Sequence, residues 1–465
     1  MKRAFFRVIN LSDKSVVLQS FLGKLPEQAA AKLAHAIEMD RMMDGKALPH
    51  DAILMGLRPS LRQLHGGSSR TRTPLRLFCQ PFEDLLTSEP RRAKQKGIIA
   101  RATVAPVFTW LGGTLLPNET SAYCREVKAL VMANDDDGAL AKAIQFWNQA
   151  GPAMRDALAG DAAVKAMRKV FRAEEIEDAR EMALLIIAGE EMLKVQTTLP
   201  KPPARISEEV LWQLRAIYDV LIDRSPDAAP YVAVVAMNRL QRPCEALRLP
   251  LMVSRQTGDA LISKTDMGLV GEIIFGRMDA LQTAILATRT GAFDADTLLA
   301  QVEGFSDLSS SVVKEMEMRR DGEWGQRLLK DRAAVGDVMD AFMERAIKEV
   351  SQALPIQKGA SDVTKHVAPE KRASALTYAR LVGGARKFAA AASFAAKHKT
   401  VTEEISHHLR RYVEDAVREL KGEGERRTAA EFQLNYCAEL AGLLSSPEEA
   451  ELIRRRVRAA SPAAA

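Results

Sequence analysis

The spacing of apolar residues restricts this chain most strongly, because it repeats with the period of an α-helix. In three segments, apolar side chains recur at or close to positions i, i+4, i+7 and i+11. These are Val210, Leu214, Ile217 and Leu221; Ile274, Met278, Leu281 and Ile285; and Trp324, Leu328, Val335, Met339 and Phe342, with a polar gap at Asp331. Each segment predicts a helix that buries one narrow stripe and leaves its charged side chains outside.

Composition supports a helical fold, because unbranched residues dominate and aromatic residues make up only 5% of the chain. Helices are predicted over residues 26–44, 119–133, 138–149, 161–197, 207–224, 266–290, 295–319, 323–353, 370–397, 402–421, 428–444 and 447–459. Only residues 4–11 and 15–21 are rich enough in Phe, Val and Ile for strands, which predicts a short N-terminal β-hairpin. The predicted fold class is all-α, with several lobes built as helix bundles or as an irregular solenoid.

Three stretches without helical periodicity divide the chain. They are a Gly/Ser/Arg loop at residues 65–74, a proline-rich linker around Pro200 to Pro203, and residues 355–369, which form the best hinge candidate. The expected parts are a basic N-terminal region 1–116, helical lobes 117–199 and 204–354, a C-terminal bundle 367–460 and a frayed tail 461–465.

The sequence favours a cytoplasmic location. Arg7 and Asn10 interrupt the apolar core that a secretory signal would need, and no stretch reaches the roughly 18 apolar residues that span a bilayer. The four cysteines are scattered and form no CxxC pair, as is typical of reduced thiols in a cytosolic protein. A membrane partner is not expected either, because the apolar side of the basic segment 363–400 consists mostly of methyl groups and offers little area for insertion.

Local motifs give no positive argument for catalysis. The chain has no phosphate-binding glycine loop and no Gly-x-Ser-x-Gly sequence. The pairs Glu403 with His407 and Glu404 with His408 have i,i+4 spacing, which suits an exposed helical turn better than a metal site. We assign no catalytic residue, no metal and no cofactor. An enzyme whose site forms between helices stays an alternative, with these four residues as its least poor candidates.

The charges are unevenly distributed, although 66 Lys and Arg nearly balance 60 Asp and Glu. Residues 58–101 hold ten basic and three acidic side chains, and residues 363–400 hold eight basic and one acidic. The rest of the chain is therefore acidic overall. The candidates for binding a polyanion or a charged partner are Arg70, Arg72, Arg76, Arg91, Arg92, Lys94, Lys96, Arg101, Arg372, Arg380, Arg386 and Lys387. Phe78 and Phe82 lie among them, and core packing is favoured over base stacking for both.

We therefore predict a non-catalytic helical scaffold or adaptor that recognises a protein partner, or a second copy of itself, through charged surfaces. The alternative is a nucleic-acid-binding protein whose two basic segments grip backbone phosphates.

Overall fold

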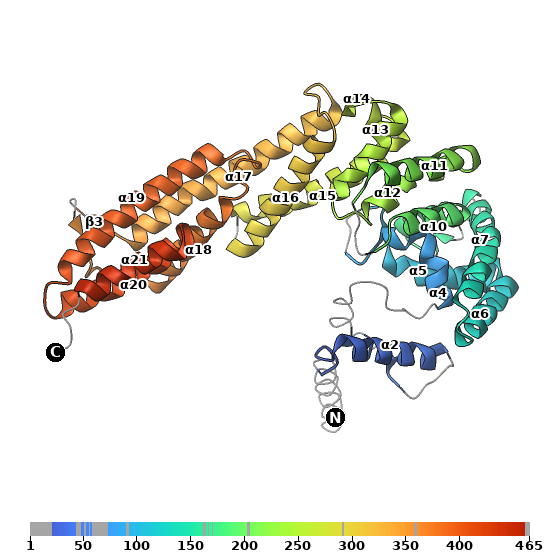
Figure 1. The fold of residues 1–465 in the computed structure, drawn as a ribbon, viewed down its shortest axis with the longest axis horizontal. Helices are drawn as coiled ribbons and strands as arrows, with labels where there is room; N and C mark the ends of the chain where they lie inside the picture. Colours follow the sequence, from blue (N-terminus) through green and yellow to red (C-terminus); the bar gives the residue numbers. More distant parts are fainter. Residues whose placement is uncertain are drawn as a thin grey trace. The chain divides into compact units, whose positions relative to one another are not determined.

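The computed structural model describes residues 21–42, 48–50, 53–54, 56–57, 73–89, 93–160, 164–165, 167–169, 171–201, 205–290, 293–357 and 360–460. These residues are mainly helical (Figure 1), which confirms the predicted fold class. The predicted N-terminal hairpin lies outside the described residues except for Phe21, which is helical. None of the helices described combines the length and the apolarity needed to cross a bilayer.

The chain forms two compact units. Unit 1 holds residues 1–256 and 264–273, and unit 2 holds residues 257–263 and 274–465. The chain therefore passes between the units three times, and one helix, α15 (Leu269–Ala287), begins in unit 1 and continues in unit 2. The boundary between the units falls within the predicted lobe 204–354, and the lobe boundaries stay predictions.

Unit 1 is built from short and medium-length helices. In chain order they are α2 (Glu27–Met42), α4 (Pro74–Cys79), α5 (Arg101–Trp110), α6 (Pro117–Met132), α7 (Asp136–Ala159), α9 (Ala173–Ile187), α10 (Gly189–Thr198), α11 (Glu208–Arg224), α12 (Tyr231–Met237) and α13 (Arg248–Ser254). A 3-10 helix η1 (Gln80–Leu85) follows α4, and two-residue strands β1 (Leu86–Thr87) and β2 (Ile99–Ala100) pair in parallel.

The core of unit 1 surrounds α12, in which every residue is buried. Phe78 and Phe82 belong to this unit's core, with rings in an edge-to-face arrangement 5.8 Å apart, so the core-packing prediction is confirmed. The prediction of one continuous helix over 161–197 is wrong, because α9 and α10 are separated at Ala188. Gly189 follows that break, where a Cβ atom would come within 2.7 Å of the Trp147 ring. Close packing therefore requires glycine at the start of α10.

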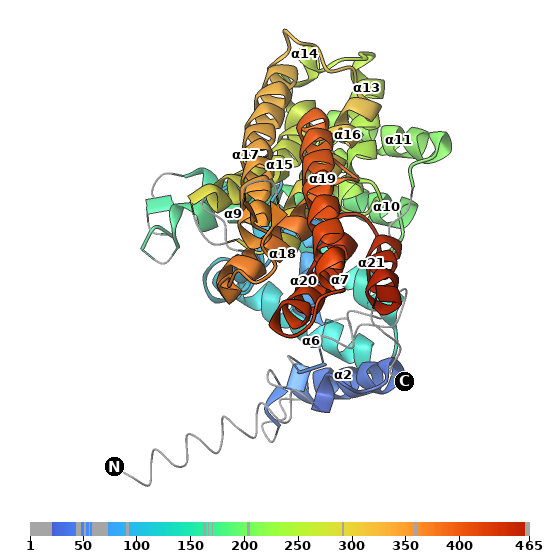
Figure 2. The ribbon, with the colours of Figure 1, turned by 90° about the vertical axis from the view of Figure 1, so that its left-hand side faces the viewer.

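Unit 2 combines the short helix α14 with longer helices. They are α14 (Asp259–Ile262), most of α15, α16 (Ala295–Glu315), α17 (Glu323–Ala353), α18 (Pro369–Ala385), α19 (Ala395–Glu419), α20 (Glu425–Leu444) and α21 (Pro447–Ala460). Helices α19, α20 and α21 lie side by side in both ribbon views (Figures 1 and 2). Between α17 and α18, strands β3 (Ile356–Gln357) and β4 (Ala360–Ser361) pair antiparallel, and Ser361 donates to Asp415 of α19. This predicted hinge segment thus lies inside unit 2.

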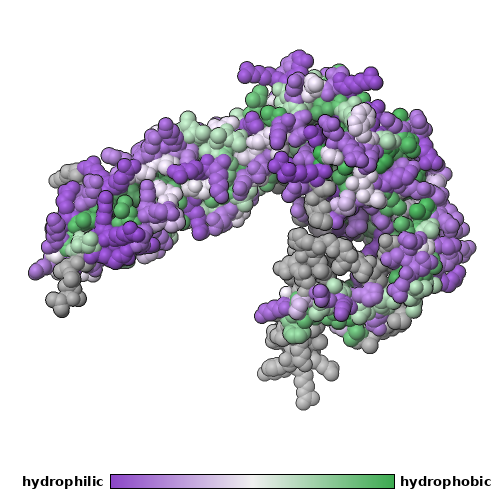
Figure 3. Space-filling model, in the orientation of Figure 1, coloured by the Kyte–Doolittle hydropathy of each residue, from purple (hydrophilic) through white to green (hydrophobic). Residues whose placement is uncertain are grey.

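The periodic stripes form the core of unit 2. Trp324, Leu328, Val335, Met339 and Phe342 of α17 are all buried, as predicted from their spacing. Hydrophilic side chains cover most of the face of the unit 2 helices seen in Figure 3. Gly383 lies within α18, and a Cβ atom at this position would come within 2.0 Å of the Leu443 carbonyl oxygen. The glycine therefore allows α18 and α20 to pack closely.

Candidate functional site

Eight of the twelve predicted binding residues lie in the described part of the chain. Arg76, Lys94, Lys96 and Arg101 belong to unit 1, and Arg372, Arg380, Arg386 and Lys387 belong to unit 2. The other four, Arg70, Arg72, Arg91 and Arg92, lie outside the described residues. The two basic segments thus contribute to different units.

Lys94 has a role inside the protein. Its ammonium group lies 3.0 Å from Asp178 Oδ1 and also pairs with Glu181 of α9, and both carboxylates are buried. The same Glu181 accepts hydrogen bonds from the Tyr231 hydroxyl and the Gly97 amide. Burial and the neighbouring Glu181 raise the pKa of Tyr231, so its hydroxyl keeps its proton and continues to donate. Lys94 therefore ties its segment to α9, and Glu181 in turn links α9 to Tyr231 of α12.

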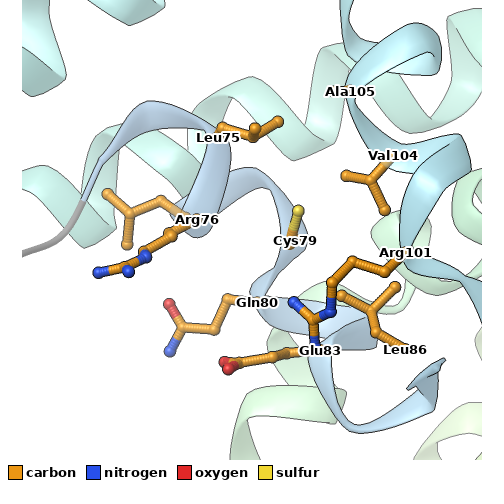
Figure 4. Close-up of a pocket in the computed structure, with 10 residues that line it drawn as sticks. Leu75, Arg76, Cys79, Gln80, Glu83, Leu86, Arg101, Val104 and Ala105 are labelled. Atoms are coloured by element: carbon orange, nitrogen blue, oxygen red, sulfur yellow. The ribbon is translucent and has the colours of Figure 1, made fainter. Parts of the chain in front are cut away.

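Arg76 and Arg101 come together at a pocket of about 370 Å³ between α4, η1 and α5 (Figure 4). Leu75, Leu77, Leu86, Val104 and Ala105 provide its aliphatic walls. Arg76 already forms an ion pair with Glu38 of α2 at 2.6 Å. Arg101 is exposed and forms no ion pair with any described residue, and Figure 4 shows its side chain near Glu83. The pocket thus combines an apolar interior with a charged mouth.

Cys79 lines this pocket, but its environment does not activate the thiol. Burial, followed by the nearby Glu83 carboxylate, raises the pKa of Cys79 to about 12, although Arg101 opposes the shift. A thiol with this pKa is protonated at neutral pH and is therefore a poor nucleophile. The pocket is suited to reversible binding rather than to covalent chemistry at Cys79.

The predicted basic residues of unit 2 are spread over several surroundings. Arg372 stacks on the rings of Phe432 and Tyr436, at 4.5 and 5.8 Å from their centroids. Arg380 pairs with Asp296 of α16 at 2.9 Å. Arg386 and Lys387 are exposed, and neither forms an ion pair with a described residue. Only these last two present free positive charge.

Among the described residues, the Glu/His pairs of α19 do not form part of a metal-binding cluster. His408 Nε2 lies 2.8 Å from the Leu354 carbonyl oxygen, so the ring donates a structural hydrogen bond between α19 and the end of α17. Glu403, Glu404 and His407 are exposed. Within the described residues, no three His, Cys, Asp or Glu side chains come together as a metal ion would require.

An exposed apolar stripe on α11 was not among the predicted sites. Leu214, Tyr218 and Leu221 bury one face of this helix. On the opposite face, Trp212 is 64% exposed and Val220 is 42% exposed, with exposed Ala216 between them at i+4 spacing. The signal was present in the sequence, since Trp212 falls outside the predicted buried stripe of its segment. A large exposed aromatic residue in such a stripe is typical of a partner-binding surface.

An acidic residue lies at each end of the exposed stripe of α11. Glu209 and Asp223 are exposed, and each lies seven residues from Ala216, which places both on the same face as the stripe. The distance from Glu209 to Asp223 along the helix is about 21 Å. We call Glu209, Trp212, Ala216, Val220 and Asp223 the α11 face.

Comparison with known proteins gives no relative for this chain. No protein-family model, no curated protein and no solved structure matches it.

Proposed function

We propose that this protein is a helical scaffold that binds a protein partner through the α11 face. The observation that carries the proposal is the largely exposed Trp212. It is the first residue of an apolar stripe that has an acidic residue at each end. Tryptophan is the residue type most often found at the energetic centre of protein interfaces. We place this scaffold in the cytoplasm, in line with its scattered unpaired cysteines.

The charges select the kind of partner. If two copies of the α11 face paired antiparallel about Ala216, Glu209 of each copy would meet Asp223 of the other. Parallel pairing would also place like charges together, and both arrangements are destabilising. The favoured occupant is therefore a different protein that offers an amphipathic helix with an apolar stripe and basic residues one to two turns to either side.

A nucleic-acid partner has less support. Lys94, Arg76, Arg380 and Lys397 all belong to the two basic segments, and each is paired with a carboxylate of the protein itself. Charges that are already paired release few counterions when they meet a phosphate backbone.

The test uses two labelled helical peptides that share one apolar stripe and differ only in carrying lysine or glutamate at both ends. Fluorescence anisotropy with the full-length protein should show binding of the lysine-ended peptide. Trp212→Ala should weaken that binding roughly thirtyfold, because interface tryptophans commonly contribute about 2 kcal/mol or more. The matched control is Leu329→Ala, which truncates an exposed apolar residue of α17 and should leave binding unchanged.

Charge reversal provides the specificity test. The double variant Glu209→Lys with Asp223→Lys should prefer the glutamate-ended peptide, because the charges at both ends of the stripe are inverted. Equal binding of the two peptides by the wild type, or no change of preference in the double variant, would refute the α11 face as the recognition surface.

A further inference from the structure

The pocket between α4, η1 and α5 has no part in the proposed scaffold function, yet its lining has the features of a small-ligand site. Its volume of about 370 Å³ lies within the range typical of small-molecule pockets. Five of its lining side chains are aliphatic, and the polar ones include two arginines and one glutamate, Arg76, Arg101 and Glu83. Such a division suits a ligand with an apolar body and one polar end.

The charges at the mouth define that polar end. Arg101 stands in the first turn of α5 and has no ion-pair partner among the described residues, whereas the charge of Arg76 is balanced by Glu38. Arg101 can therefore offer a full guanidinium fork to an anion. Glu83 shares the pocket, as Figure 4 shows, and would repel a second negative charge on the ligand.

We propose that this pocket reversibly binds a small amphiphilic monoanion, a free carboxylate on an apolar body. The carboxylate meets Arg101, and the apolar body lies against Leu77, Leu86 and Val104. The protonated Cys79 thiol acts as part of the wall and forms no bond to the ligand. This site is independent of the α11 face, so either proposal can fail without the other.

Isothermal titration calorimetry on the full-length protein tests the ligand class with three probes of equal chain length: octanoate, octylammonium and octanol. Octanoate should bind with a dissociation constant below about 1 mM, as expected for a ligand of this size. Octylammonium and octanol should bind at least tenfold more weakly, because the ammonium group has no acceptor for the Arg101 guanidinium and the octanol hydroxyl lacks the negative charge and second acceptor oxygen of a carboxylate. Saturable binding of octylammonium in preference to octanoate would overturn the proposal.

Substitutions of the two charged residues at the pocket mouth should change the affinity for octanoate in opposite directions. Arg101→Gln should weaken octanoate binding roughly tenfold or more, and Glu83→Gln should tighten it roughly threefold to fivefold. Ala105 is exposed at the pocket, so Ala105→Phe should block the cavity and abolish binding without disturbing the core. The matched control is Arg125→Gln, an exposed arginine of α6 away from the pocket, which should bind octanoate as the wild type does.

Circular dichroism confirms the helical content of each variant before titration. No saturable octanoate binding by the wild type below about 10 mM would refute the site. Unchanged binding in a folded Arg101→Gln or Ala105→Phe variant would refute it equally.

Discussion

At the scale of single residues, the structure separates basic side chains that are available to partners from those that hold the fold together. Lys94 is the clearest example of the second kind, because it forms ion pairs with two buried carboxylates. Lys94→Met should lower the free energy of unfolding by about 3–5 kcal/mol, since Asp178 and Glu181 would be left buried without their cation. Urea denaturation measures this loss.

Lys96 is the control for that prediction. It lies two positions away and is exposed, and its ammonium group lies 6.0 Å from the centroid of the Tyr231 ring. Lys96→Met should change the free energy of unfolding by less than about 0.5 kcal/mol. Equal costs for the two substitutions would mean that the buried carboxylates do not depend on Lys94.

Asp331 predicts a dependence of stability on pH. Burial, together with the nearby Asp279, raises the pKa of Asp331 above its usual value, and its Oδ1 accepts a hydrogen bond from Gln282 at 3.1 Å. Because the pKa is higher in the folded state, the folded protein holds a proton that the unfolded chain has lost, and stability falls as pH rises through this interval. Asp331→Asn should therefore be more stable than the wild type at pH 7.

The advantage of Asp331→Asn should shrink as the pH falls and vanish below the ordinary aspartate pKa, where the carboxyl group is protonated in both states. Urea denaturation series from pH 3 to pH 7 on both proteins measure the difference. A difference that does not vary with pH would show that burial of the charge is not its origin.

At the scale of elements, α17 depends on a cap that comes from another helix. Asp259 of α14 is fully buried and accepts hydrogen bonds from the amides of Arg319 and Gly325, at 3.1 and 3.0 Å. Asp259→Ala should cost about 2–3 kcal/mol, because it removes the cap and leaves buried donors without acceptors. Hydrogen exchange should quicken first in the opening turn of α17.

Asp321 is the control for Asp259. It is also an acidic residue close to the start of α17, but it is exposed and pairs with Arg319 at the surface. Asp321→Ala should change stability by less than about 0.5 kcal/mol. Faster exchange spread evenly over unit 2 in the Asp259 variant would contradict a local capping role.

Helices with a clear apolar stripe could be predicted from the sequence, and the others could not. The predicted range 323–353 coincides with α17, because its stripe is long and Asp331 interrupts it only once. Helix α12 was not predicted, since a helix buried on all sides shows no amphipathic period. Gly189, directly after the break between α9 and α10, packs against Trp147, about 40 positions away, and no local pattern reveals this contact.

The candidate sites, too, could be predicted only in part from the sequence. The positive charge of residues 58–101 was visible in the sequence, but the partners that neutralise it were not, because Glu38 and Asp178 lie far from Arg76 and Lys94 along the chain. The pocket depends on how α4 and α5 pack, and therefore also required a structure. The exposed Trp212, in contrast, could have been recognised from its position outside the buried stripe.

At the scale of the whole molecule, two compact units with their own cores predict two unfolding transitions. Differential scanning calorimetry of the full-length protein should resolve them. Lys94→Met should lower the temperature of one transition and Asp259→Ala that of the other, because the two residues belong to different units. One transition that both substitutions shift equally would show that the units unfold together.

The cap on α17 also bears on how the protein is made. Asp259 leaves the ribosome 60 residues before Arg319 and 66 residues before Gly325, the two residues whose amides it binds. The last segment of unit 1, residues 264–273, is synthesised within that interval. Unit 1 can therefore complete its core before the amides that Asp259 binds have been synthesised, while the Asp259 carboxylate is still solvated. The order of synthesis thus favours folding of unit 1 before unit 2.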